Sequence, residues 1–205
     1  FVLKLAENEV PVALEALAGV VAPADFPALA KMMDKNPGAE VEKAMKAALK
    51  TLPAAEKYNA VKAAADAAAK PELLYNVMAT AANPEAIAYL TEKYEAGSET
   101  ALKALSTIND LAVAPVLLKA ADADQNYLTR YVSIINAKET NVDKKCENLV
   151  KALQKASDAK IQNTVIKAMG GIPTMRAFTV VGEWLDNAET AYTAAAAAKS
   201  IASKN

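Results

Sequence analysis

The sequence contains no histidine and only one cysteine, Cys146, among its 205 residues. Without histidine, a Ser-His-Asp triad, a Cys-His pair and a histidine metal or haem ligand are all excluded. One thiol is too few for a thiolate zinc site or an iron–sulfur cluster, and an intramolecular disulfide is impossible. We therefore expect neither a metal nor another cofactor.

Phosphate-binding loops are also missing, because neither G-x-x-x-x-G-K nor G-x-G-x-x-G occurs. The one glycine pair, Gly170-Gly171, falls where a helix is expected to end, and a helix stop accounts for it. Apolar runs are too short to span a bilayer, so no membrane span is expected. The net charge of −1 shows no basic excess, and we therefore expect no nucleic-acid partner.

Helix-forming residues dominate what is present. Hydrophobic residues make up 53% of the chain and charged residues 23%, which is typical of a globular protein. Sequence breaks recur every 10–16 residues, as at Asn83-Pro84-Glu85, where an asparagine cap, a proline and an acid predict a helix start. No segment alternates polar and β-branched residues, so strands are not expected.

The predicted helices pair into repeats. Every second helix carries two apolar residues three positions apart, and the pair recurs about every 30 residues, with one longer step across Lys138–Asp143. The pairs are Leu17/Val20, Leu49/Leu52, Met78/Ala81, Leu105/Ile108, Val132/Ile135, Met169/Ile172 and Ala198/Ile201. We predict an all-α superhelix (solenoid) of about seven two-helix units, forming a single repeat domain over residues 1–205. Regular spacing with a recurring proline favours this over an ordinary helical bundle.

Two further segments share a motif. "ADFPALAKMM" (24–33) and "VAPVLLKAA" (113–121) each place a proline before small and apolar residues. Together with "ALEALAGV" (13–20), "ALKALSTI" (101–108) and "VIKAMGGI" (165–172), they resemble HEAT-like repeats, especially the short repeats of phycobilisome-lyase-type proteins. The resemblance is good for three or four repeats and poor over 53–82 and 174–204. It implies a fold and carries over no catalytic residue.

Candidate catalytic residues have structural explanations. Cys146 shares one helical face with Val142, Leu149 and Leu153, which predicts a buried, unreactive thiol. Two acid pairs, Glu40/Glu42 and Asp122/Asp124, lie near predicted helix starts, where acids favour the positive end of the helix dipole. The third, Glu183/Asp186, lies near a predicted helix end, where capping or solvation explains it. The aromatics are either core residues or interface anchors; they are Tyr75, Tyr127, Tyr131 and Trp184. We expect no enzymatic activity.

Polar positions on the second helices form a modest basic row, consisting of Lys43, Lys46, Lys50, Lys103, Arg130, Asn163 and Lys167. Either this row is a solvated helix face, or it contacts an acidic protein or a glycan. If the row is functional, we expect Lys46, Lys103, Arg130 and Lys167 to bind the partner. None of these four residues lies on the apolar stripe of its predicted helix, so we do not expect them to pack in the core.

Two functions fit this architecture. The first is a non-catalytic scaffold for protein–protein or interdomain binding. The second is an accessory module of a carbohydrate-active enzyme such as a sugar hydrolase, since the chain resembles Ala- and Lys-rich HEAT segments of Bacteroidetes-like proteins. The apolar segment Phe1–Leu5 and the alanine-rich segment Ala191–Ala202 lack a polar outer face. They predict a neighbouring domain in a longer chain.

Overall fold

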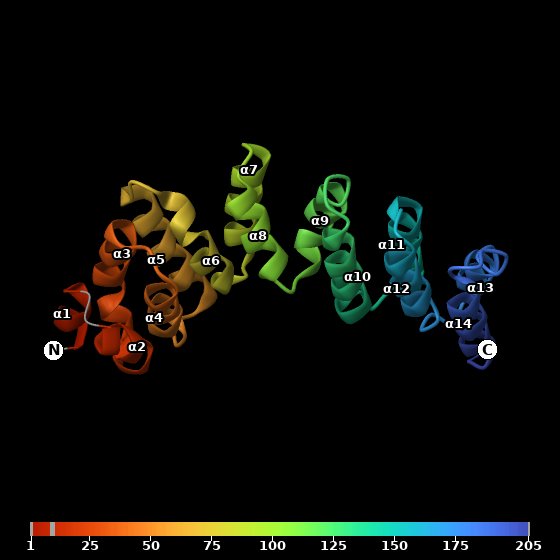
Figure 1. Cartoon of the computed structure of the whole chain (residues 1–205), viewed down its shortest axis with the longest axis horizontal. Helices are drawn as coiled ribbons and strands as arrows, with labels where there is room; N and C mark the ends of the chain where they lie inside the picture. The colour runs from red at the N-terminus through yellow and green to blue at the C-terminus, as the bar shows by residue number, and fades with distance from the viewer. Residues whose placement is uncertain (1, 9–10, 205) are drawn as a thin grey trace. The chain divides into compact units, whose positions relative to one another are not determined.

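The computed structural model describes residues 2–8 and 11–204, and within these residues it contains α-helices and short 3-10 turns but no strand (Figure 1). Phe1 lies outside the described residues. The expected all-α fold is confirmed. None of the helices in the described part combines the length and apolarity needed to cross a membrane.

Within the described residues, the helices follow one another as seven pairs. Figure 1 labels them in chain order from α1 to α14. In each pair, the first and second helix contact one another. The pairs are α1 (Val2–Glu7) with α2 (Pro11–Val20), α3 (Phe26–Lys35) with α4 (Ala39–Leu49), α5 (Ala54–Ala67) with α6 (Tyr75–Met78), α7 (Pro84–Glu95) with α8 (Glu99–Thr107), α9 (Ala114–Ala120) with α10 (Asn126–Lys138), α11 (Val142–Lys155) with α12 (Ala159–Met169), and α13 (Met175–Gly182) with α14 (Ala191–Ala202).

The chain forms two compact units, unit 1 ending at Ile108 and unit 2 beginning at Asn109. In unit 1 the second helices pack in sequence, α2 on α4, α4 on α6 and α6 on α8. In unit 2, α10 packs on α12 and α12 on α14. This stacking of helix pairs within each unit confirms the predicted α-solenoid of two-helix repeats. A single domain over residues 1–205 stays a prediction.

Most of the predicted core positions are buried, although Leu52 and Ala198 are only half-buried. Leu105 and its equivalents Leu17, Leu49 and Met169 each have 0% of their surface exposed, as the repeat register requires. Val20 is an exception at 58% exposure, because it is the last residue of α2 and follows the final buried turn of that helix.

Sequence signals fix several helix boundaries. The Asn83 side chain accepts a hydrogen bond from the Ala86 amide at 2.9 Å, directly before Pro84 opens α7. Gly97 follows that helix with a φ of 99°, a left-handed conformation that favours glycine. Ser98 then caps α8 by accepting from the Ala101 amide. Asp25 behaves differently, because its carboxylate accepts from the Ala22 amide instead of capping α3.

Helix lengths were predicted less well. Several helices are shorter than the expected 10–16 residues, and α6 has only four. Pro71 begins a 3-10 turn (Pro71–Leu74) before α6, and a second 3-10 turn (Ala79–Ala81) follows α6. The next residue, Ala82, has a left-handed φ of 47°. These turns replace most of the expected helix in the segment where the repeat motif is poorest.

Candidate partner-binding surface

The four predicted partner-binding residues all lie on second helices, two in each unit. Lys46 is on α4 and Lys103 on α8, two helices that both pack on α6. Arg130 is on α10 and Lys167 on α12, which pack directly on one another.

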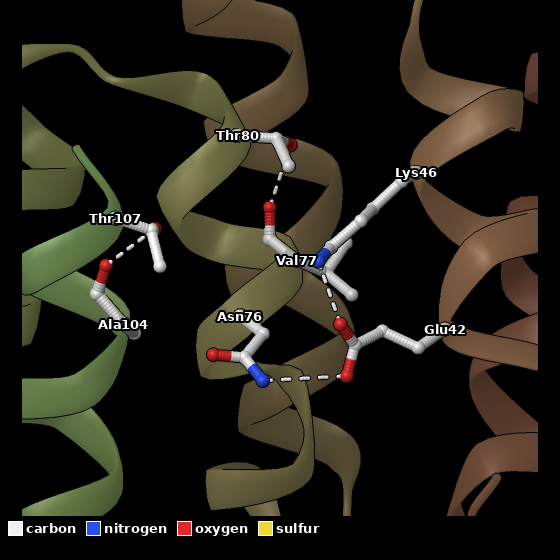
Figure 2. Close-up of polar contacts among 7 residues, drawn as sticks. All are labelled: Glu42, Lys46, Asn76, Val77, Thr80, Ala104 and Thr107. Carbon is white, nitrogen blue, oxygen red and sulfur yellow. Dashed lines mark hydrogen bonds and ion pairs between the residues drawn. The ribbon is translucent and has the colours of Figure 1, made fainter. Parts of the chain in front are cut away.

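Lys46 is already engaged within unit 1. Its ammonium group lies 2.6 Å from Glu42 Oε1, one helical turn earlier on α4. The other oxygen of Glu42 accepts a hydrogen bond from Asn76 Nδ2 on α6 at 3.3 Å (Figure 2). Glu42 thus joins two neighbouring repeats and balances the charge of Lys46. Lys43 has a similar partner in Glu40, at 3.9 Å.

The unit 1 surface near α6 and α8 also carries Lys103, Thr80 and Thr107. Lys103 is exposed on α8. The Thr80 hydroxyl donates to the Val77 carbonyl, and the Thr107 hydroxyl to the Ala104 carbonyl, both at 2.7 Å (Figure 2). Because these bonds return to the backbone of the same turn, the two hydroxyls satisfy local structure first.

Unit 2 presents its basic residues along two grooves. Arg130 lines a groove between α10 and α12 of about 820 Å³, together with Ser133, Lys160 and Thr164. Lys167 lines a second groove between α12 and α14 of about 480 Å³. Both grooves border α12, so they lie on either side of one helix.

Asn163, the neutral member of the predicted row, has a structural role. Its Nδ2 donates to the Ala159 carbonyl at 2.8 Å and to the Glu189 carbonyl at 2.9 Å. The second bond ties α12 to the loop before α14. Gln125 makes an equivalent tie, because its amide contacts the Lys155 carbonyl and the Ser157 amide of the following repeat.

Two of the four candidate aromatic anchors are unsuitable for binding. Tyr75 and Tyr131 are buried, and the Tyr131 hydroxyl donates to the Asn148 carbonyl at 3.3 Å. Burial raises the pKa of Tyr131 to about 12. Tyr127 and Trp184 are half-buried, which leaves part of each ring accessible.

Two aromatic features were missed from the sequence. Tyr192 on α14 is 89% exposed and lies at the α12–α14 groove. Tyr89 lies edge-on to Tyr75, with the Lys62 and Lys93 ammonium groups 5.4 and 5.0 Å from its ring centroid. The side chains of Tyr89, Tyr75, Lys62 and Lys93 thus connect α5, α6 and α7, and cation–π attraction stabilises their contact. Burial raises the pKa of Tyr89.

The catalytic candidates have structural surroundings. Glu40 and Glu42 lie in the first turn of α4, Asp124 accepts from the Asn126 amide at the start of α10, and Asp122 forms an ion pair with Lys155. Glu183 and Asp186 are exposed just after α13. Within residues 2–8 and 11–204, no group of three or more acidic or cysteine side chains could hold a metal ion.

Cys146 is buried as predicted, with 1% of its surface exposed. We expect its thiol to react with a maleimide or disulfide reagent at least about a hundredfold more slowly in the native protein than in denaturant, because the reagent reaches it only after local opening. Stopped-flow absorbance at 412 nm with a chromogenic disulfide measures both rates. Equal rates in the two conditions would contradict a buried thiol.

Comparison with known proteins points to the same repeat type. Residues 114–202 match the family model of HEAT repeats. This match covers α9 to α14 and less than half of the chain. Neither a curated protein nor a solved structure matches the chain. HEAT repeats generally serve as protein-interaction scaffolds and are typically non-catalytic.

Proposed function

We propose that this chain is a non-catalytic scaffold that binds a protein partner through the exposed surface of its second helices. The observation that carries the proposal is the stacking of these helices within each unit, with Lys103 and Lys167 exposed on them. Stacked helices offer many weak contacts at fixed spacing, and a partner that touches several of them gains affinity that one contact cannot supply. A neighbouring domain of a longer chain is a partner of the same kind.

The similarity to HEAT repeats supports a binding role, and the surroundings of Cys146 and of the acid pairs fit a chain without a catalytic site. An accessory role beside a sugar hydrolase stays an alternative prediction. Absence of nucleic-acid binding stays a prediction as well.

The test replaces Lys46, Lys103, Arg130 and Lys167 together by glutamine. Peptides selected from a display library against the wild-type protein serve as ligands in an anisotropy titration. We expect the dissociation constant to rise about tenfold, because four positive charges on the second helices, each contributing roughly 0.2–1 kcal/mol to a surface contact, are removed. We also expect high salt to weaken wild-type binding.

A matched control carries the same change in charge on first helices, at Lys31, Lys57, Lys119 and Lys144. We expect this control to bind the selected peptides within about twofold of wild type, because surface charges away from the contact matter little. Equal losses in both variants, or none in either, would show that the second-helix surface is not where peptides bind.

A further inference from the structure

We propose that this chain pairs with a second copy of itself through the exposed face of α13, with the two helices antiparallel about a twofold axis near Thr179. The inference goes beyond the proposed function, because it concerns a first helix of unit 2 and a different partner. Three observations carry it: the exposed apolar side chains of α13, the reversed order of its charges, and the match of both patterns under a twofold axis.

The first observation is a group of exposed apolar side chains on one short segment. Met175 is 76% exposed, Phe178 41% and Leu185 43%, and they lie on α13 or in the turn directly after it. Single exposed apolar residues are normal, whereas a contiguous group marks an interaction site. The opposite side of α13 belongs to the core, because Ala177 and Val181 are fully buried.

Helical periodicity arranges the exposed residues of α13 in three rows. The helical spiral continues into the turn after α13, because the Glu183 amide donates to the Thr179 carbonyl and the Leu185 amide to the Gly182 carbonyl. The middle row consists of Met175, Thr179 and Gly182. An apolar row lies on one side of it and a charged row on the other, and each consists of two residues seven positions apart, Phe178 with Leu185 and Arg176 with Glu183.

The second observation is that the charges of α13 run against its own helix dipole. A helix favours acids in its first turn and cations in its last turn, and α4, α7 and α11 follow this rule at both ends. In α13 the first turn carries Arg176, Glu183 lies at the C-cap, and Asp186 follows. This order is unfavourable within the helix and becomes favourable beside a helix that runs in the opposite direction.

No group in the described part of the chain offsets these charges. Within residues 2–8 and 11–204, the side chains of Arg176, Glu183 and Asp186 form no ion pair. The neighbouring helices carry exposed charges that also leave them unpaired, Asp143 and Lys144 on α11 and Lys199 on α14. Other lysines of α11 and α12 are engaged elsewhere, Lys151 and Lys155 in ion pairs and Lys167 at the α12–α14 groove.

The third observation is that a twofold axis brings unlike charges together. In an antiparallel pair the start of one α13 lies beside the end of the other, so Arg176 of each copy faces Glu183 and Asp186 of the other copy. A parallel pair would instead place like charges together, which disfavours that orientation. The same patch then serves on both copies, as a twofold interface requires.

The apolar side chains also match under this axis. Met175 of one copy lies opposite Gly182 of the other, where even an added Cβ would meet no atom within 4 Å, so a flexible methionine has room. Phe178 meets its own counterpart close to the axis, and aromatic pairs add to apolar burial. The Thr179 hydroxyl already donates to the Met175 carbonyl at 3.1 Å, so covering it leaves no donor unsatisfied.

The pair should be weak. One short helix and one turn from each copy make an interface at the low end of the usual sizes, so we expect a dissociation constant of the order of 10–100 µM. Unfolding measurements at lower concentrations therefore report on the monomer. A dimer presents each second-helix surface twice, so a partner with two binding segments gains avidity.

Sedimentation equilibrium on the full chain from about 5 to 500 µM tests the pairing. The monomer mass is 21.5 kDa, and the average mass should rise with concentration towards twice this value. A constant monomer mass over the whole range would overturn the proposal. A mass that rises beyond the dimer would overturn it as well, because a twofold interface closes at two copies.

The apolar contact is located by Met175→Glu, which should weaken pairing at least about tenfold because it places a charge in the middle row. Val12→Glu is the matched control, since Val12 is 74% exposed and lies on α2 in unit 1. This control should pair within about twofold of wild type. Equal losses in the two variants would refute the placement on α13.

The orientation is tested by reversing the charges. Arg176→Glu and Glu183→Arg should each weaken pairing about tenfold, because like charges then face each other. Both changes favour the dipole of α13, so thermal unfolding at low concentration should show a monomer at least as stable as wild type. Lys119→Glu on α9 makes the same change in charge as Arg176→Glu and should leave pairing within about twofold of wild type.

The variant that combines Arg176→Glu with Glu183→Arg decides between the two orientations. In an antiparallel pair its opposite charges face each other again, so pairing should recover to within about threefold of wild type. A combined variant that pairs as weakly as the single variants would overturn the antiparallel arrangement.

Discussion

Replacing Leu105 by alanine should lower the free energy of unfolding by about 2–5 kcal/mol, the range for truncating a buried leucine. Leu105 has no exposed surface, and its helix α8 packs on both α7 and α6. The cavity left by the substitution would therefore lie where two repeats meet. Since whole domains are stable by only about 5–15 kcal/mol, this single change removes a large share of the stability of unit 1.

Urea unfolding followed by circular dichroism measures the loss, and hydrogen exchange locates it. Amides of α6, α7 and α8 should lose protection most, because each repeat is stabilised mainly by its neighbours. Lys103→Ala is the control on the same helix, and it should change stability by less than about 0.5 kcal/mol because lysine and alanine are both good helix formers. A Leu105→Ala effect as small as that of Lys103→Ala would contradict the repeat register.

The repeat register was predictable because it depends on one recurring constraint. A second helix packs on its own first helix and on the next second helix, so one position per repeat is crowded from several sides. Leu17, Leu49, Leu105 and Met169 occupy that position, and all are fully buried. A 30-residue period therefore indicated both the fold and the core, even where the repeat motif itself was weak.

Helix lengths depend on local turns, which the 30-residue period of the sequence does not predict. The 3-10 turns around α6 arise from Pro71 and from a left-handed Ala82, a conformation that alanine seldom adopts. No residue spacing in the sequence predicts this left-handed conformation of Ala82. The register of α14 was shifted for a similar reason, because Ala194, Ala197 and Ile201 are buried there and a run of alanines hides which face is inside.

The candidate surface was only partly predictable. Periodicity placed Lys46, Lys103, Arg130 and Lys167 on second helices, where the structure has them. The Glu42–Lys46 pair has the i, i+4 spacing that favours an ion pair, but the Asn76 contact depends on the packing of α4 on α6. Tyr192 was missed because its exposure depends on the rotation of α14.

The pattern of charges differs between the second helices of unit 1 and those of unit 2. In unit 1 the acids of α4 hold its lysines in local pairs, which links repeats and reduces the attraction for an anionic partner. In unit 2 the acids lie on first helices and in loops, as with Glu147 paired to Lys151 and Asp122 paired to Lys155. Asp158, which caps the start of α12, also lines the α10–α12 groove beside Arg130 and Lys160.

Gly170→Ala should destabilise the protein by about 1–3 kcal/mol, the usual cost of adding a methyl group to a packed site. Gly170 is buried at the end of α12. An added Cβ would lie 3.0 Å from the Cα of Ala197 and 3.1 Å from its Cβ. Because one of these atoms is backbone, a side-chain rotation cannot relieve the contact, and α14 must move away from α12.

The backbone conformation of Gly170, taken alone, predicts that Gly170→Ala raises the stability of the protein, whereas the close packing predicts that it lowers it. The sign of the measured change therefore distinguishes the two effects. Gly170 has a φ of −58°, so alanine fits its backbone and should stabilise by about 0.4–1 kcal/mol through the unfolded chain. Gly182→Ala provides that reference, because Gly182 ends α13 in unit 2 and an added Cβ there meets no atom within 4 Å. We expect thermal unfolding to show Gly182→Ala at or above wild type and Gly170→Ala clearly below it. If both variants are stabilised, the close approach of α12 and α14 is wrong. If Gly170→Ala alone loses stability, the helix spacing that sets the α12–α14 groove depends on a position where only glycine fits.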